Sequence, residues 1–300
     1  MTAGLSPLSI ALPALILAAL AGALGVKSGL LGNVTEDNGF IAPQTVMIEP
    51  RIMTYRAEGH YLRDGFPVDA PMVTKTLQAP FEIMKYQVTT ANYAQCVIDG
   101  ACMATDIRPQ KAGQGTGNVP VTGVNFTDAA NYAKWLSEKT GETWQLPTDE
   151  QWAFAAGSKF PDDALGIEGD DGSNPALRWL KDYERESARK QARNPALRPS
   201  EAFGENELGV ADMAGNVWEW TRTCHRRVNV DEAGNVQSDI PACGIYVVDG
   251  KHRASMSFFI RDPKTGGCSV GVPPDNLGFR LVRDGRWYVP LLQRVASIFG

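Results

Sequence analysis

Five cysteines and three histidines are the residues of this chain whose chemistry depends most on spacing. In an oxidising compartment, five cysteines would form two disulfides and leave one thiol, here drawn from Cys96, Cys102, Cys224, Cys243 and Cys268. Cys96 and Cys102 flank the turn IDGA, which makes them the easiest pair. Cys224 with Cys243, across a loop, is the second expected pair.

Zinc binding is the alternative use of these side chains. Structural zinc sites usually show closely spaced cysteine or histidine pairs. The chain has no CxxC spacing, and its histidines are scattered at positions 60, 225 and 252. A zinc site is therefore disfavoured.

The segment DMAGNVWEW, residues 212–220, gathers acidic, amide and tryptophan side chains around one glycine. Polar and aromatic residues are too dense here for a plain strand, and apolar positions repeat too rarely for a helix. The segment predicts an irregular loop that is held by buried polar groups.

The composition indicates an ordinary globular protein that does not bind nucleic acid in general. Of its 300 residues, 43% are hydrophobic and 21% are charged, and the formal net charge is −5. A nucleic-acid-binding surface would require an excess of basic residues. The length suits one large domain or two small ones.

The N-terminal segment predicts export from the cytoplasm. Residues 8–26 carry no charge and are long enough to span a bilayer, and small residues at 19–23 offer cleavage sites. We expect residues 1–30 to be a signal peptide or a membrane anchor, followed by a linker at 31–43. The destination would be the periplasm or the exterior, with residues 8–26 the sole contact with a membrane if they are not cleaved.

Three stretches carry helix signals. Residues 89–100 have threonines that can cap a helix and a closing glycine. In the second, Thr127 can cap a helix whose apolar residues recur at three- and four-residue spacing up to Gly141. In the third, Thr148 and Gln151 have capping-box spacing, and Gly157 ends the helix. After Gly204 helix signals stop, and few regular elements are expected.

Three motifs occur in order along the chain: PVTGVNFTDAANYAKWLSEKTGETWQLPTDEQWAFAAG, LGVADMAGNVWEWT and NLGFRLVRD. Together they resemble the sulfatase-modifying-factor domain, best known from the formylglycine-generating enzyme. The resemblance covers residues 44–284 and leaves a C-terminal tail at 285–300. It implies an α+β fold related to C-type lectins, with few strands and much irregular loop.

The resemblance implies a structural calcium ion at the opening of the tryptophan-rich segment. The ligands would be Asp212, the carbonyls of Gly215 and Val217, and the carboxylate of Glu219. Oxygen ligands on a tight turn suit calcium. The alternative is a loop held by hydrogen bonds alone, with Glu219 paired to a buried arginine such as Arg280. Trp218 and Trp220 would point to opposite sides, one of them toward a groove.

The copper-binding cysteine pair of the formylglycine-generating enzymes is missing from the matching segment. Counted back from NLGFR without a gap, an arginine of the family falls on Arg261, and the two cysteines fall on His252 and Ser257. Cu(I) requires soft thiolate ligands. Copper is therefore not expected. Iron is not expected either, because the three scattered histidines do not match the three-histidine iron site of the related sulfoxide synthases. His252 and Ser257 remain weak catalytic candidates, beside the simpler reading of His252 as a hydrogen-bonded histidine.

The groove of the family would be lined here by Trp218, Arg253 and Arg261. The two arginines could bind an anion or a carboxylate, although structural ion pairs are the commoner use of such residues. No member of this set identifies a substrate.

The resemblance implies three possible functions. The first is an exported accessory or maturation factor that acts on a partner protein or cofactor precursor. Residues 250–284 look most like a branch associated with copper nitrite reductases, which suggests a periplasmic reductase as partner. The second is a non-catalytic, lectin-like binding module, and the third is a formylglycine-generating oxidase. Whether the chain is an enzyme stays open at this point.

Overall fold

The computed structural model describes residues 41–106, 117–164, 196–265 and 274–284, with isolated positions between 180 and 187. The apolar segment at residues 8–26 lies outside these ranges. Within them, no helix is long and apolar enough to cross a membrane.

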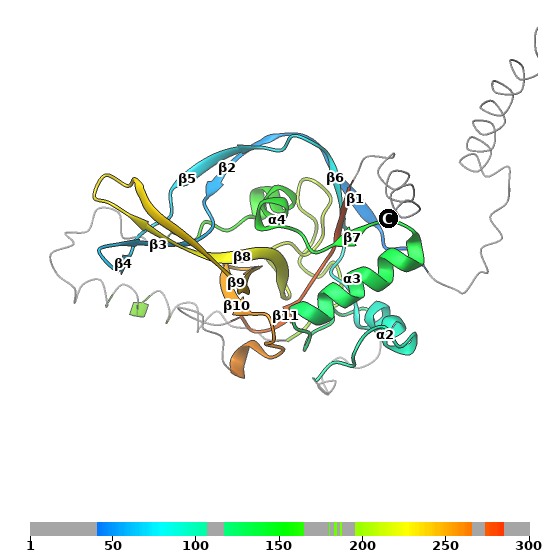
Figure 1. The fold of residues 1–300 in the computed structure, drawn as a ribbon. Coiled ribbons are helices and arrows are strands. Elements are labelled where there is room, and N and C mark those ends of the chain that lie inside the picture. Colours follow the sequence, from blue (N-terminus) through cyan, green and yellow to red (C-terminus); the bar gives the residue numbers. More distant parts are fainter. Residues whose placement is uncertain are drawn as a thin grey trace, which may run out of the picture. The chain divides into compact units, whose positions relative to one another are not determined.

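The described residues form a mixed α+β fold, as the sequence predicted (Figure 1). Three α-helices have both ends within the described ranges: α2 (Thr90–Ile98), α3 (Phe126–Thr140) and α4 (Asp149–Ala156). Two short 3-10 helices are η1 (Gly157–Lys159) and η2 (Pro263–Thr265).

Twelve strands occur in the described ranges. They are β1 (Thr45–Ile48), β2 (Ile52–Arg56), β3 (His60–Arg63), β4 (Phe66–Pro67), β5 (Met72–Thr76), β6 (Phe81–Met84), β7 (Trp144–Gln145), β8 (Trp218–Val230), β9 (Val236–Asp249), β10 (Ala254–Ser257), β11 (Leu277–Gly278) and β12 (Val282–Asp284).

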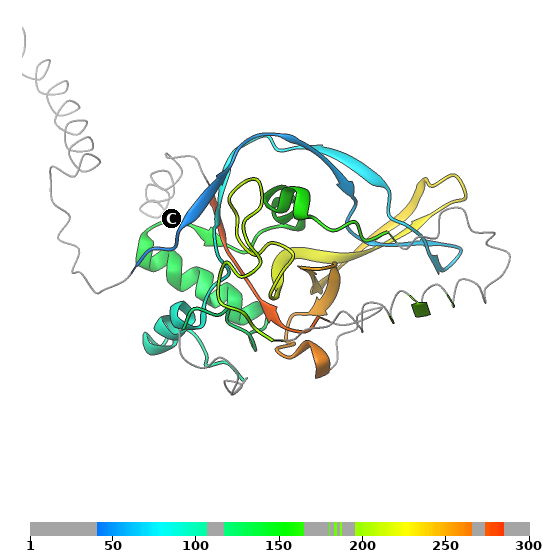
Figure 2. The same cartoon turned by 180° about the vertical axis from the view of Figure 1, so that it is seen from behind.

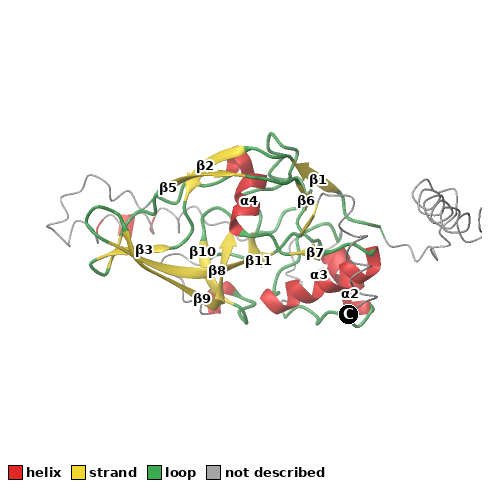
Figure 3. Ribbon diagram, turned by 45° about the horizontal axis from the view of Figure 1, so that its top comes forward, coloured by secondary structure: helices red, strands yellow, loops and turns green. Residues whose placement is uncertain are grey.

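These strands build three sheets. One has the order β1-β6-β12-β7, and a second has the order β10-β9-β8-β3-β4, with β11 added in parallel to β8. The third is the pair β2-β5. Helix α4 lies between the β2-β5 ribbon and the β8-β9 strands (Figure 3). It is buried on most sides, and its Phe154 packs edge-on against Tyr55 of β2.

Local capping explains where the helices begin and end. Helix α4 starts after the capping box of Thr148 and Gln151 and is followed by Gly157, as predicted. Helix α3 ends at Gly141, whose φ of 69° favours glycine. Its N-cap, however, is Asn125, so the prediction of Thr127 is wrong by two residues. The Asn125 side chain accepts the Asp128 backbone N–H at 2.9 Å, and the Asp128 carboxylate accepts that of Asn125.

The expectation of little regular structure after Gly204 is wrong for residues 218–249. Strands β8 and β9 have 13 and 14 residues and form a long antiparallel hairpin, which projects from the rest of the described fold (Figures 1 and 2). The pairing register shifts between Trp220 and Cys224, between Cys224 and His225, and between Asn229 and Val230. Each irregularity interrupts the alternation of polar and apolar residues, which is the signal by which a strand is recognised in a sequence.

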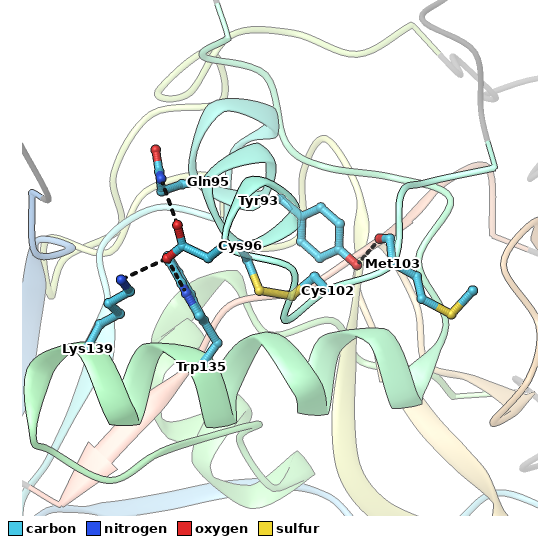
Figure 4. The surroundings of a disulfide bond; sticks show 8 residues. Tyr93, Gln95, Cys96, Cys102, Met103, Trp135 and Lys139 are labelled. Carbon is cyan, nitrogen blue, oxygen red and sulfur yellow. Dashed lines mark hydrogen bonds and ion pairs between the residues drawn. A yellow bond between two sulfur atoms is a disulfide. The ribbon is translucent and has the colours of Figure 1, made fainter.

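Both predicted disulfides are present. Cys96 and Cys102 close the end of α2, with their Cα atoms 5.3 Å apart (Figure 4). Cys224 of β8 and Cys243 of β9 are joined with a Cα separation of 4.8 Å. Cys268 lies outside the described residues.

Candidate functional site

The tryptophan-rich segment is a chain of left-handed turns that leads into β8. Asp212, Ala214 and Asn216 have φ values of 58°, 56° and 64°, which non-glycine residues adopt only with support. The Asp212 carboxylate supplies that support by accepting the backbone N–H groups of Glu201 and Phe203 at 2.7 and 2.8 Å. Asn216 clamps the backbone of Arg198 in the same way, through its side-chain oxygen and nitrogen.

Glu219 is the centre of a fully buried polar network. Its Oε2 accepts hydrogen bonds from Arg280 Nε at 2.6 Å and from Trp152 Nε1 at 2.9 Å. Its Oε1 accepts from Arg280 Nη2 and from Gln87 Nε2, both at 2.8 Å. The bidentate pairing with Arg280, together with Trp152 and Gln87, gives each carboxylate oxygen two donors, the arrangement in which a buried charge is best compensated.

Arg280 extends the network to three backbone carbonyls on two segments of the chain. Its guanidinium donates to the carbonyls of Met84, Lys85 and Ala211. Strand β8, helix α4 and the ends of β6 and of the 205–212 loop are therefore tied to a single ion pair. Both side chains of this ion pair are wholly buried, so its role is to stabilise the fold.

The oxygens of Asp212, Gly215 and Glu219 that are expected to bind calcium accept hydrogen bonds in this arrangement. N–H groups point at both oxygens of Glu219 and of Asp212, and the Gly215 carbonyl accepts from Gln87 Nε2 at 3.2 Å and from Val217 N at 2.8 Å. These N–H donors compete with a cation for the same oxygens. The arrangement is the alternative in which Glu219 pairs with Arg280, and calcium remains a prediction for metal analysis.

The described residues contain no group of three or more histidine, cysteine, aspartate or glutamate side chains that could hold a metal ion.

The structure brings His252 and Trp218 together. The Trp218 indole donates to the His252 carbonyl at 2.9 Å, and the two rings meet edge to face with centroids 5.1 Å apart. Lys251 lies over the same indole. Both Trp218 and Trp220 are buried, and the Trp220 indole bonds instead to the Val124 carbonyl. Ser257 lies at the end of β10, opposite Ile245 of β9.

Gly250 lets Trp218 pack closely on the turn before His252. A methyl group at Gly250 would lie 2.7 Å from the indole, closer than real contacts allow. We expect Gly250→Ala to lower the free energy of unfolding by about 1 kcal/mol through overpacking. Urea denaturation would measure this, with the neighbouring exposed Lys251→Ala as the control. Equal free energies of unfolding for the two variants would show that the turn can move to accommodate the methyl group without measurable cost.

The two arginines assigned to the groove are engaged in ion pairs on different neighbours. Arg261 bonds to Asp106 at 2.7 Å and to Asp128 at 2.9 Å. Arg253 pairs with Asp163 at 3.3 Å and with Asp149 at 3.5 Å, and it donates to the Arg56 carbonyl. They therefore do not form one anion-binding site in this arrangement.

Sequence reasoning missed a buried acidic cluster around Arg253. Asp149 begins α4 and Asp249 ends β9, and both are buried. Neither oxygen of Asp249 receives a hydrogen bond from the part of the chain that the structure describes. Burial, reinforced by the negative charge of Asp149, raises the pKa of Asp249 well above its ordinary value.

The pKa values of the neighbouring carboxyl groups Asp149 and Glu58 are also raised. Burial also raises the pKa of Asp149, against the lowering effect of Arg253. The pKa of Glu58 is raised to about 8, first by burial and then by Asp149. The single positive charge of Arg253 cannot neutralise Asp149, Asp163 and Asp249 together. The folded chain therefore favours protonation of part of this acidic cluster. An aspartate that directly ends the apolar run IYVV was the only sequence signal for it.

Comparison with known proteins places most of the chain in one family model. Residues 32–285 match the model described as "Sulfatase-modifying factor enzyme 1-like domain".

Curated relatives include proteins named formylglycine-generating enzyme and proteins named as inactive forms of it. The chain is 28% identical over 179 residues to "Inactive C-alpha-formylglycine-generating enzyme 2" of Mus musculus, covering 57% of this chain and 53% of that protein. It is 34% identical over 108 residues to the formylglycine-generating enzyme of Mycobacterium tuberculosis, covering 35% of this chain and 33% of that enzyme. The first of these relatives is matched over about half its length.

Among solved structures, PvdO from Pseudomonas aeruginosa superposes with a TM-score of 0.51 at 23% sequence identity. The superposition covers 81% of this chain and 95% of PvdO. It supports the shared fold.

Proposed function

Because the chain belongs to the family of sulfatase-modifying factor enzyme 1-like domains, we propose that it is an exported accessory or maturation factor for a partner protein. It would act without the copper-binding thiol pair. One observation carries the proposal: the positions matched to that pair are His252 and Ser257, while four of the five cysteines are joined elsewhere in disulfides. An imidazole and a hydroxyl do not replace two thiolates as ligands of Cu(I).

Two further features support this reading. The disulfides fit an oxidising compartment, and the uncharged segment at residues 8–26 fits export to it. The relative from Mus musculus is named an inactive formylglycine-generating enzyme. A role without formylglycine chemistry is therefore compatible with this family.

The partner would be recognised beside the segment that contains His252 and Ser257. Directly after Ser257, the aromatic side chains of Phe258 and Phe259 are 46% and 60% exposed, and their rings lie edge to face. Exposed aromatic residues are favoured at protein interfaces. A periplasmic reductase is our proposed partner, in keeping with the resemblance of residues 250–284 to the nitrite-reductase-associated branch.

Capture of partners from the periplasm of the native host tests the proposal. We expect the full chain to retain a periplasmic reductase, and the variant Phe258→Ser/Phe259→Ser to lose at least ten-fold of it. Ile98→Ser, which changes a still more exposed apolar residue on α2, is the control. If the double variant and the control retain equal amounts, the aromatic pair is not the binding surface.

An enzymatic assay separates the remaining functions. We expect no aldehyde when the purified chain, loaded with Cu(I), is incubated with a cysteine-containing sulfatase peptide. Formation of the aldehyde would overturn the proposal in favour of the oxidase. A retained partner whose mass and cofactor content do not change on incubation would indicate the lectin-like binding module, which the exposed aromatic pair also suits.

A further inference from the structure

The two disulfides of this chain differ sharply in their exposure. Cys96 is fully buried and Cys102 is 8% exposed. Cys224 is half-buried and Cys243 is exposed. Thiol–disulfide exchange requires an incoming thiolate to reach one of the two sulfur atoms, so the second disulfide is the reachable one.

Residues of α2, α3 and the following loop surround the Cys96–Cys102 disulfide (Figure 4). The Tyr93 hydroxyl donates to the Met103 carbonyl at 3.0 Å. Asp99, inside the same loop, accepts a bond from the Trp135 indole and pairs with Lys139 at 2.8 Å. These contacts hold the Cys96–Cys102 loop against α3, and they give the chain a buried disulfide for comparison.

The second disulfide lies in an irregular and open part of the β8-β9 ladder. Register shifts occur on both sides of Cys224, so the flanking ladder is weakened. Residues 240–243 of β9 are exposed. At Gly244, no atom lies within 4 Å of the place where a side chain would begin. A thiol can therefore approach Cys243 from solvent.

The charges near Cys224 favour its thiolate form. Residues 221–230 contain three arginines and a histidine but no acidic residue. Arg222 and Arg227 are exposed, whereas Arg226 is paired with Asp239 of β9. His225, whose Nδ1 lies 2.8 Å from the Ser255 hydroxyl, has a pKa lowered by burial and then by His60, and it contributes little charge at neutral pH. Within the described part of the chain, neither Arg222, whose Nε donates to the Leu146 carbonyl at 3.1 Å, nor Arg227 bonds to a carboxylate. Their positive charge favours an anionic leaving group at Cys224.

From this asymmetry we propose that Cys224–Cys243 is a thiol–disulfide exchange site, which reacts with an accessible thiol of a partner protein or a small thiol. The incoming thiolate attacks Cys243 Sγ and forms a mixed disulfide. The Cys224–Cys243 bond breaks, and its electron pair leaves on Cys224 as a thiolate. A second thiol then attacks the mixed disulfide, so that two thiols are oxidised to a disulfide and Cys224 and Cys243 are reduced.

This site differs from the copper-binding pair of the formylglycine-generating enzymes. It joins the long strands β8 and β9, whereas the positions matched to that pair are His252 and Ser257. The inference does not depend on the proposed partner, because it concerns the reactivity of this chain toward any thiol.

Differential alkylation of the native, full-length chain tests the proposal. The protein is incubated with increasing dithiothreitol in the presence of a chelator, the free thiols are alkylated, and each cysteine is quantified by mass spectrometry. We expect Cys224 and Cys243 to open at least ten-fold faster than Cys96 and Cys102. Equal rates, a reversed order, or opening of Cys224–Cys243 only in denaturant would overturn the proposal.

Trapping of the intermediate and two variants test the direction of attack and the role of charge. When the native chain is incubated briefly with reduced glutathione and then alkylated, glutathione should be found on Cys243 and the alkyl group on Cys224 several-fold more often than the reverse. Arg222→Gln should slow reduction about two- to three-fold, whereas Arg222→Lys, which keeps the charge, should not. Preferential trapping at Cys224 would refute the assigned direction, and equal rates for the two Arg222 variants would refute the electrostatic part.

Discussion

Replacing Glu219 by alanine is expected to lower the free energy of unfolding by about 3–5 kcal/mol, because it leaves a buried guanidinium without its counter-charge. Arg280 is wholly buried and would keep only its backbone acceptors. Gln87 and Trp152 would lose an acceptor in the same substitution. Since natural domains are stable by about 5–15 kcal/mol, the variant would retain only part of its stability. Denaturation followed by tryptophan fluorescence measures the change.

The matched control for this prediction is an ion pair at the surface. Glu205 bonds to Lys85 at 2.7 Å, with its side chain 44% exposed, and Glu205→Ala should cost less than about 1 kcal/mol. The double variant Glu219→Leu/Arg280→Met should recover much of the loss, because it removes both buried charges together. A loss for Glu219→Ala no larger than for Glu205→Ala would contradict the central role of the pair.

The same variant addresses the calcium prediction. If Glu219 holds an ion pair, a chelator should leave the melting temperature of the native chain unchanged. A chelator-induced drop that is absent from Glu219→Ala would instead restore the calcium site, since it would show that this carboxylate binds the ion.

Replacing Asp249 by asparagine should, in contrast to Glu219→Ala, stabilise the fold at alkaline pH. The folded chain offers no hydrogen-bond donor to either oxygen of this carboxylate among its described residues. An amide carries no charge into the same site, although its own polar atoms stay poorly satisfied there. The expected gain is roughly 1–3 kcal/mol at pH 8, and chemical denaturation across a pH series would measure it.

The pH dependence follows from the direction of the pKa shift. In the unfolded chain Asp249 titrates near the ordinary value of about 3.9, and in the folded chain its pKa is well above that. Between the two pKa values the folded state binds more protons, so stability falls as pH rises. One such group contributes a slope of up to about 1.4 kcal/mol per pH unit in this window. Asp249→Asn should flatten that slope.

Asp162 is the natural control for this titration. Its hydrogen bond with Arg56 lowers the pKa of that carboxyl, so its stabilising contribution is present at neutral pH and is lost as pH falls. Asp162→Asn should therefore weaken the fold slightly at neutral pH and leave the alkaline slope intact. Identical pH profiles for the native chain and Asp249→Asn would show that Asp249 is compensated by a group outside the described ranges.

The sequence determined the features that depend on near neighbours in the chain. The capping box of Thr148 and Gln151 joins residues three apart, and the Cys96–Cys102 bridge spans six residues. The family followed from motifs read in order, and with it the α+β class. Even at this range the choice between two possible caps was decided by contacts, since Asn125 rather than Thr127 bonds to the start of α3.

The tertiary structure decided which charges are buried together. Glu219 and Arg280 are 61 residues apart, and the sequence could offer their pairing only as an alternative to calcium. Asp149 and Asp249 come from a helix start and a strand end. Arg253, from the following turn, pairs with Asp149 and acts on Asp249 through its charge. The physical reason is that helix caps and short disulfide loops join residues separated by only a few backbone bonds, so the neighbouring sequence is enough to predict them. The cost of a buried charge depends instead on every segment that excludes water from it, and those segments meet only in the folded chain.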